Sequence, residues 1–140
     1  MQDHVAHASV RIHATASEVW DALTRPELIE KYFFGTHVET DWKPGSPVVF
    51  KGSFKGKSYQ DKGKVLECVP GHKLVHTYWS SMGGEPDRPE HYKTVSYELK
   101  PEADGTLLTL TQDHNASEDA REHSEQNWRQ VLQGLKQVVE

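Results

Sequence analysis

Cysteine is nearly absent from this sequence, and long apolar runs are absent altogether. Cys68 is the single cysteine among 140 residues, which excludes an internal disulfide and a cysteine-based zinc cage. No stretch approaches the roughly 18 consecutive apolar residues of a membrane-spanning helix. The N-terminus MQDHVAHASV lacks the basic start and apolar core of a signal peptide. We therefore expect a cytoplasmic protein with no membrane insertion.

The sequence also lacks an excess of basic residues. Lys and Arg number 16 against 21 Asp and Glu, which gives a formal net charge of −5 with both signs interspersed along the chain. Binding to the phosphates of DNA or RNA usually needs a clustered positive surface. The phosphate-loop pattern, Gly-x-Gly-x-x-Gly and Gly-x-Ser-x-Gly are missing as well. These absences argue against a nucleic-acid partner, a nucleotide cofactor and a serine-hydrolase nucleophile.

Nine histidines raise the question of a metal site. His72 and His76 are four residues apart in an expected strand, where a rise of about 3.3 Å per residue separates them by roughly 13 Å. One ion binds its ligands at about 2 Å, so this pair cannot share a metal through that spacing. The motif His-Glu-x-x-His is absent. We predict no metal and no cofactor.

The length and the aromatic content favour one folded domain over residues 1–140. A single core is usually built from roughly 100 to 200 residues. The chain has four Trp, five Tyr and four Phe, and such large side chains bury enough surface to make disorder a poor interpretation.

The spacing of apolar residues predicts a strand, two short helices, a run of strands and a long helix. Residues 4–13 alternate in polarity, as in a strand with one apolar face. Thr15 and Glu18 have capping-box spacing at the start of a helix, and Pro26 restarts a second one. From Thr36 the period changes to two, with turns at Gly-containing pairs, which indicates a meander of antiparallel strands.

The C-terminal segment predicts a long amphipathic helix. Its apolar stripe consists of Trp128, Val131, Leu132, Leu135, Val138 and Val139. Upstream the same stripe passes through the small residues Ser124 and Ala120, which would leave space beside the beginning of the helix. Asn115 and Glu118 have capping-box spacing, and we expect them to begin this helix.

Several polar residues are predicted on the same sheet face as the apolar core. The period of two turns them inward with Leu74, Val65, Leu108 and Leu110; they are Tyr59, Asp61, His76, Tyr78, Gln112 and His114. A buried polar group without a partner costs roughly 1 to 3 kcal/mol. A group of them on one inner face therefore implies mutual hydrogen bonds, water or a ligand, and as a set they favour a cavity.

Five segments resemble one protein family. They are residues 14–24 (ATASEVWDALT), 41–50 (DWKPGSPVVF), 63–78 (GKVLECVPGHKLVHTY), 95–110 (VSYELKPEADGTLLTL) and 127–138 (NWRQVLQGLKQV). Their order and spacing resemble the START-like (SRPBCC) superfamily, and within it the activator of 90-kDa heat-shock-protein ATPase homologue-like domains. The resemblance implies an α+β helix-grip (START-like/Bet v 1-like) fold, in which a curved antiparallel sheet wraps a long C-terminal helix and two short helices follow the first strand. Similar domains include lipid carriers, polyketide cyclases and hydrolase-like members.

These observations lead to three functional hypotheses. The first is a protein that binds a small hydrophobic or aromatic molecule between sheet and last helix, with candidate ligand-binding residues Trp20, Phe50, Tyr59, Asp61, His76, Tyr78, Gln112 and Trp128. The second is a cyclase- or hydrolase-like enzyme using His76 as acid or base, oriented by Asp61 or Tyr78. The third is an interaction domain for a chaperone-type partner. We assign no catalytic residue, and ligand identity and oligomeric state stay open.

Overall fold

A computed structural model of the 140-residue chain describes residues 4–33, 35–54, 56–80, 86–88, 91–115 and 117–140. Within them the chain forms, in order, β1 (His4–Ile12), α1 (Ala16–Thr24), α2 (Pro26–Tyr32), β2 (His37–Glu39), β3 (Pro47–Phe54), β4 (Lys57–Val69), β5 (Lys73–Tyr78), β6 (Lys93–Glu102), β7 (Gly105–Asn115) and α3 (Glu118–Val139). The predicted element order is confirmed.

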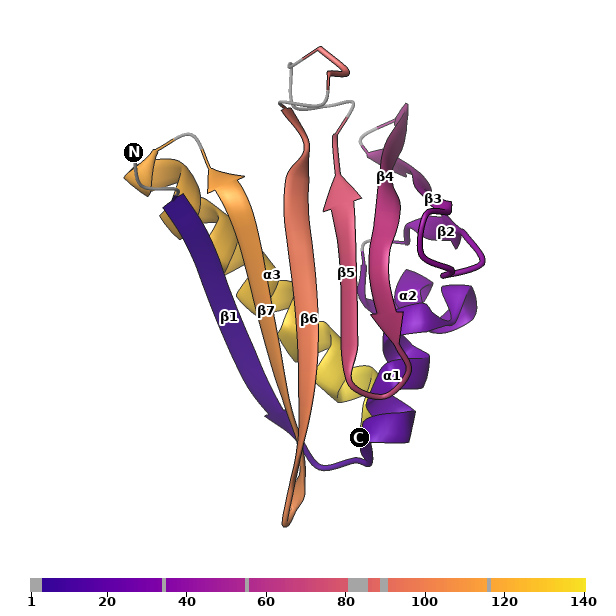
Figure 1. Ribbon diagram of the computed structural model, residues 1–140, viewed down its shortest axis with the longest axis vertical. Helices are drawn as coiled ribbons and strands as arrows, with labels where there is room; N and C mark the ends of the chain where they lie inside the picture. Colours follow the sequence, from indigo (N-terminus) through magenta and orange to yellow (C-terminus); the bar gives the residue numbers. More distant parts are fainter. Residues whose placement is uncertain (1–3, 34, 55, 81–85, 89–90, 116) are drawn as a thin grey trace.

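The strands form one seven-stranded sheet in the order β1-β7-β6-β5-β4-β3-β2. Every neighbouring pair is antiparallel, including β1 and β7, because the last strand of the meander returns to pair with the first strand of the chain. Figure 1 shows α3 crossing one face of this sheet obliquely, with α1 and α2 beside its C-terminal half. This arrangement is the helix-grip fold, and the predicted fold class is confirmed.

The two short helices begin as the sequence predicts. The hydroxyl of Thr15 accepts a hydrogen bond from the Glu18 amide at 3.1 Å, and the Glu18 carboxylate accepts one from the Thr15 amide at 3.3 Å. This capping box satisfies backbone donors that the first turn of a helix leaves unpaired. Pro26 is the first residue of α2, where its missing amide hydrogen removes no helical hydrogen bond.

Alternation along the strands places the core between the sheet and α3. Leu74, Leu108 and Leu110 are fully buried on the inner face of the sheet. They belong to the same core cluster as Leu132 and Leu135 of α3. Each buried Leu contributes about 1.5 to 3 kcal/mol relative to exposure, so this inner face stabilises the fold.

Two glycines allow elements to approach closely. A side chain at Gly63 of β4 would meet the Thr77 carbonyl oxygen of β5 at 1.7 Å. A side chain at Gly134 of α3 would lie 3.1 Å from Cβ of Tyr32, at the contact of α3 with α2. The first distance is too short for any β-carbon, which explains why the backbone requires glycine there.

The end of β7 differs from the prediction in two ways. The cap of α3 is Ser117, whose hydroxyl accepts from the Ala120 amide at 3.1 Å, so the prediction that Asn115 and Glu118 form the cap is wrong. His114 is exposed and has φ of 56°, so its predicted inward orientation is wrong too. This left-handed residue breaks the alternation. Asn115 therefore takes the buried position beyond Gln112.

No helix in the described ranges is both long enough and apolar enough to cross a membrane.

Candidate ligand site

Five aromatic side chains meet in a closed circuit between the sheet and α3. The ring centroids are 6.2 Å apart for Phe33 and Phe50, 5.7 Å for Phe50 and His76, and 6.2 Å for His76 and Tyr97. Tyr97 and Trp128 follow at 6.4 Å, and Trp128 returns to Phe33 at 6.0 Å. We call these residues the aromatic circuit. It joins the end of α2, three strands and α3 around one point of the inner face.

The structure brings three of the predicted residues into this circuit, namely Phe50, His76 and Trp128. Tyr78 lies next to it, with its ring 5.5 Å from that of Phe50. Its hydroxyl donates to the Asp61 carboxylate at 2.5 Å, so these two predicted residues are partners of each other. Burial, together with this hydrogen bond to Asp61, raises the pKa of Tyr78 well above its ordinary value.

Gln112 joins a polar network at the first half of α3. Its side-chain oxygen accepts a hydrogen bond from Nε1 of Trp128, and its Nε2 donates to Oδ1 of Asn115 at 3.4 Å. The Ser124 hydroxyl donates to the same Asn115 oxygen at 2.8 Å. The Asn115 amide nitrogen donates to the backbone oxygens of Gln112 and His4. The side-chain amide of Asn115 therefore occupies the space that the sequence predicted beside Ser124.

Tyr59 and Trp20 lie away from the aromatic circuit. The Tyr59 hydroxyl is 2.6 Å from Oγ1 of Thr36, and its ring covers Gly52, where an added Cβ would be 2.5 Å from that hydroxyl oxygen. Trp20 is half-buried in α1 and packs against the larger core cluster. Among the described residues, no aromatic contact joins Trp20 or Tyr59 to the circuit.

Sequence reasoning missed two members, Phe33 and Tyr97. Tyr97 carried a usable signal, because it lies two residues from Val95 and from Leu99 on β6, and all three are buried. Phe33 follows α2 as its C-cap residue, where helical periodicity no longer fixes the direction of a side chain. Its position comes from the chain turning toward β2, which the sequence pattern alone does not place.

His76 is held in one tautomer. Its Nδ1 is 2.9 Å from the backbone oxygen of Thr77. A carbonyl oxygen only accepts, so Nδ1 carries the proton and Nε2 has the free lone pair. Burial lowers the pKa of the imidazole below its ordinary value of 6.5, and the bond to Thr77 opposes this only in part. The orienting group is thus the Thr77 carbonyl, and not Asp61 or Tyr78 as the enzyme hypothesis expected.

Two polar atoms of the circuit have no hydrogen-bond partner within the described part of the chain. They are Nε2 of His76 and the hydroxyl of Tyr97, although these residues are only 4% and 8% exposed. In that same part of the chain, every side-chain nitrogen or oxygen sealed from solvent has a partner. Both atoms therefore retain some solvent-accessible surface, which a water molecule can touch.

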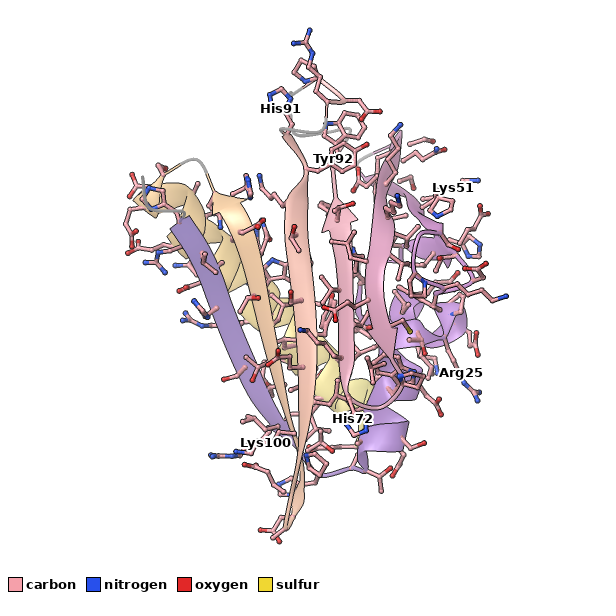
Figure 2. The ribbon with its side chains drawn as sticks, viewed as in Figure 1. Arg25, Lys51, His72, His91, Tyr92 and Lys100 are labelled. Atoms are coloured by element: carbon pink, nitrogen blue, oxygen red, sulfur yellow. The ribbon has the colours of Figure 1, made fainter. Side chains whose placement is uncertain are left out.

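No positively charged side chain is buried at this position among the described residues, and the nearest buried carboxylate, that of Asp61, accepts a hydrogen bond from Tyr78. The buried polar and charged residues are Thr36, Asp61, His76, Thr106, Gln112 and Asn115, with no Lys or Arg among them. Figure 2 shows Arg25, Lys51 and Lys100 projecting from the periphery of the sheet and helices. The described residues also contain no group of three or more His, Cys, Asp or Glu placed to hold a metal ion. The chemistry offered inside is a neutral base, hydroxyls and aromatic faces.

The comparisons with solved structures agree with the architecture. A protein from Cytophaga hutchinsonii, ChR145, has 43% sequence identity and a TM-score of 0.84, covering 95% of this chain and 91% of its own. CalU16 from Micromonospora echinospora has 23% identity and a TM-score of 0.74, covering 99% and 85%. The Aha1 dimer from Colwellia psychrerythraea has 20% identity and a TM-score of 0.75, covering 97% and 96%. The last two show likeness of fold alone.

None of the curated proteins matches the chain in sequence. The family described as Activator of Hsp90 ATPase homolog 1-like protein matches residues 13–140, which is nearly the whole chain. This family is compatible in general terms with either ligand binding or a chaperone-related interaction. The predicted resemblance is confirmed, and the chain belongs to the activator of Hsp90 ATPase homolog 1-like family.

Proposed function

We propose that this protein binds a small hydrophobic or aromatic molecule against the aromatic circuit, between the sheet and α3. The observation that carries the proposal is the pair of unpaired polar atoms, Nε2 of His76 and the hydroxyl of Tyr97, in side chains that are almost entirely buried. Because some solvent-accessible surface remains on each atom, a bound ligand or an ordered water can supply the missing hydrogen bonds.

The surroundings support an apolar ligand. Binding sites for small molecules are usually lined by apolar and aromatic side chains with a few polar groups that orient the ligand. The circuit supplies the aromatic faces of Phe33, Phe50 and Trp128. Aromatic rings stack or meet edge to face at centroid distances of about 4.5 to 7 Å, so a further ring can contact several of them at once.

A titration with toluene tests this proposal. Toluene is the simplest probe because it has an aromatic ring and no polar group. We expect saturable changes in the two-dimensional NMR spectrum centred on Phe33, Phe50, Tyr97 and Trp128, with none at the exposed His72 in the β4–β5 turn (Figure 2). Absence of saturable changes, or changes scattered over the surface, would overturn it. Native mass spectrometry of protein purified from its own source would then identify the physiological ligand.

One observation favours the enzyme alternative as a second candidate. The neutral imidazole of His76 has an accessible lone pair, which is what a general base needs. The test is hydrolysis of 4-nitrophenyl acetate by the protein and by His76→Gln, with His72→Gln as the matched surface control. An enzyme of this type loses its rate in His76→Gln alone, whereas equal small losses in both variants indicate only the general reactivity of imidazoles and reject the candidate.

A further inference from the structure

The polar atoms of the aromatic circuit also restrict the chemistry of the ligand. Resting on the proposed function, we propose that the ligand presents an uncharged hydroxyl to Nε2 of His76, and that the site discriminates against carboxylates and other anions. Phenol is the simplest aromatic member of this class.

The hydrogen bond that Nε2 of His76 can form has only one possible direction. Nδ1 of His76 is committed as a donor to the Thr77 oxygen at 2.9 Å, so Nε2 can only accept. A ligand group at that position must therefore donate. A carbonyl, an ether or a carboxylate oxygen has only lone pairs, and each would leave Nε2 unpaired or repel it. A hydroxyl donates to Nε2 and keeps a lone pair for a second partner.

The Tyr97 hydroxyl is a second uncharged polar group in the aromatic circuit. Burial raises the pKa of Tyr97 well above its ordinary value, so this hydroxyl stays protonated and can either donate or accept. Its ring lies nearly parallel to that of His76, with an interplanar angle of 30° and a centroid distance of 6.2 Å. It therefore adds a second polar group without charge to the same part of the circuit. Such a pair suits a ligand whose polar groups are also uncharged.

The described part of the site offers no positive charge to an anionic ligand. In the described residues no Lys or Arg is buried, whereas the carboxylate of Asp61 is, and it is bonded to Tyr78 beside Phe50. An anion entering this space loses its hydration and gains no ion pair. Burial also lowers the pKa of the His76 imidazole, which keeps that side chain neutral near pH 7. The electrostatics therefore favour a neutral ligand.

Four one-ring probes separate these requirements at pH 7.5. Phenol carries a neutral donor, anisole has only an acceptor, toluene has neither, and benzoate is an anion. We expect phenol to bind more tightly than anisole and at least tenfold more tightly than benzoate, measured by NMR titration. Phenol should bind at least as tightly as toluene in spite of its greater polarity. Benzoate binding as tightly as phenol, or anisole more tightly, would overturn the proposal.

The imidazole reports the hydrogen bond directly. The nitrogen-15 resonance of Nε2 moves to lower frequency when this atom accepts a hydrogen bond. We expect saturation with phenol to move it, and saturation with toluene or anisole to leave it in place. If toluene binds while phenol fails to move Nε2, the hydroxyl proposal is wrong and the binding function stands. If no probe binds, both fail.

The variant Tyr97→Phe removes one hydroxyl and keeps the ring. If the ligand hydroxyl bonds Tyr97, phenol affinity falls by about three- to tenfold, the range of one neutral hydrogen bond. Toluene affinity should then stay within about twofold. The matched control is Tyr92→Phe, because Tyr92 lies at the far upper end of the sheet and bonds Asp87 (Figure 2). Equal losses for phenol and toluene in Tyr97→Phe, or equal phenol losses in both variants, would contradict a polar role for Tyr97.

Discussion

The inner face of the sheet has two polar regions that differ in how completely their hydrogen bonds are made. Beside the first half of α3, Gln112, Asn115 and Ser124 bond one another, and Gln112 also accepts from Trp128. In the aromatic circuit, Nε2 of His76 and the hydroxyl of Tyr97 lack partners in the described part of the chain. The first region contributes to the stability of the fold. We propose that the second is available to a ligand.

The largest effect is expected where the two regions meet. Trp128 bonds Gln112 and also contacts Phe33 and Tyr97. Trp128→Ala removes both sets of interactions and leaves a cavity, so it should lower the free energy of unfolding by about 3 to 5 kcal/mol. Chemical denaturation measures this, and Trp128→Phe should lose less because it keeps a ring. A change near zero for Trp128→Ala would show that the indole is not part of the core.

The stability of the hydrogen-bonded network of Gln112, Asn115 and Ser124 should depend on each of its partners. Gln112→Leu keeps a buried side chain of comparable size but leaves Nε1 of Trp128 and Oδ1 of Asn115 each short of a hydrogen bond. We expect a loss of about 1 to 3 kcal/mol in the free energy of unfolding. Gln126→Leu, on the exposed side of α3, is the matched control and should change it little. If Gln112→Leu and Gln126→Leu have the same free energy of unfolding, the hydrogen bonds of Gln112 do not stabilise the fold and the two polar regions do not differ in this way.

The buried imidazole of His76 in the aromatic circuit should make the free energy of unfolding depend on pH. The pKa of His76 is lower in the folded protein than its ordinary value of 6.5, so the unfolded chain takes up a proton first as the pH falls. Stability from this group is thus present above pH 6.5 and is lost below it, as the pH falls toward the folded pKa. Unfolding measured from pH 8 to 5 should show this loss, and His76→Phe should reduce it. A His76→Phe profile with the wild-type slope would contradict the assignment.

The smallest effect is expected for Tyr97→Phe. The hydroxyl that this substitution removes has no hydrogen-bond partner among the described residues, so the change strands no buried group. The free energy of unfolding should change by less than about 0.5 kcal/mol. Tyr32→Phe is the matched comparison, because the Tyr32 hydroxyl donates to the Ala22 oxygen at 2.7 Å and its loss should cost more. A larger loss of unfolding free energy in Tyr97→Phe than in Tyr32→Phe would show that the Tyr97 hydroxyl makes a stabilising hydrogen bond.

Local sequence patterns predicted most of the fold. The capping box of Thr15 and Glu18, the restart at Pro26 and the stripe of α3 depend on residues close together in the chain, and each was found. The end of β7 was predicted incorrectly, because the left-handed residue His114 reverses the alternation on which that prediction rested. The same error hid the buried position of Asn115.

The site was less predictable than the fold. Alternation placed Asp61, His76 and Gln112 on the buried face, but it does not say which of them bond each other. The partners of Asp61 and Gln112 come from neighbouring strands and from α3, through contacts that only the folded chain creates. Trp20 was predicted to line the site, and in the structure it packs on the core from α1.

The central claim is that His76 belongs to a binding region and not to a closed polar network. It is tested most directly by measuring the phenol dissociation constant and the free energy of unfolding on the same variant, His76→Phe. The substitution keeps a ring against Phe50 and Tyr97 and removes one hydrogen bond to a backbone oxygen. We predict that phenol affinity falls at least threefold while the free energy of unfolding changes by less than about 1 kcal/mol. A loss of roughly 1 to 3 kcal/mol with unchanged affinity in the folded protein would contradict the claim.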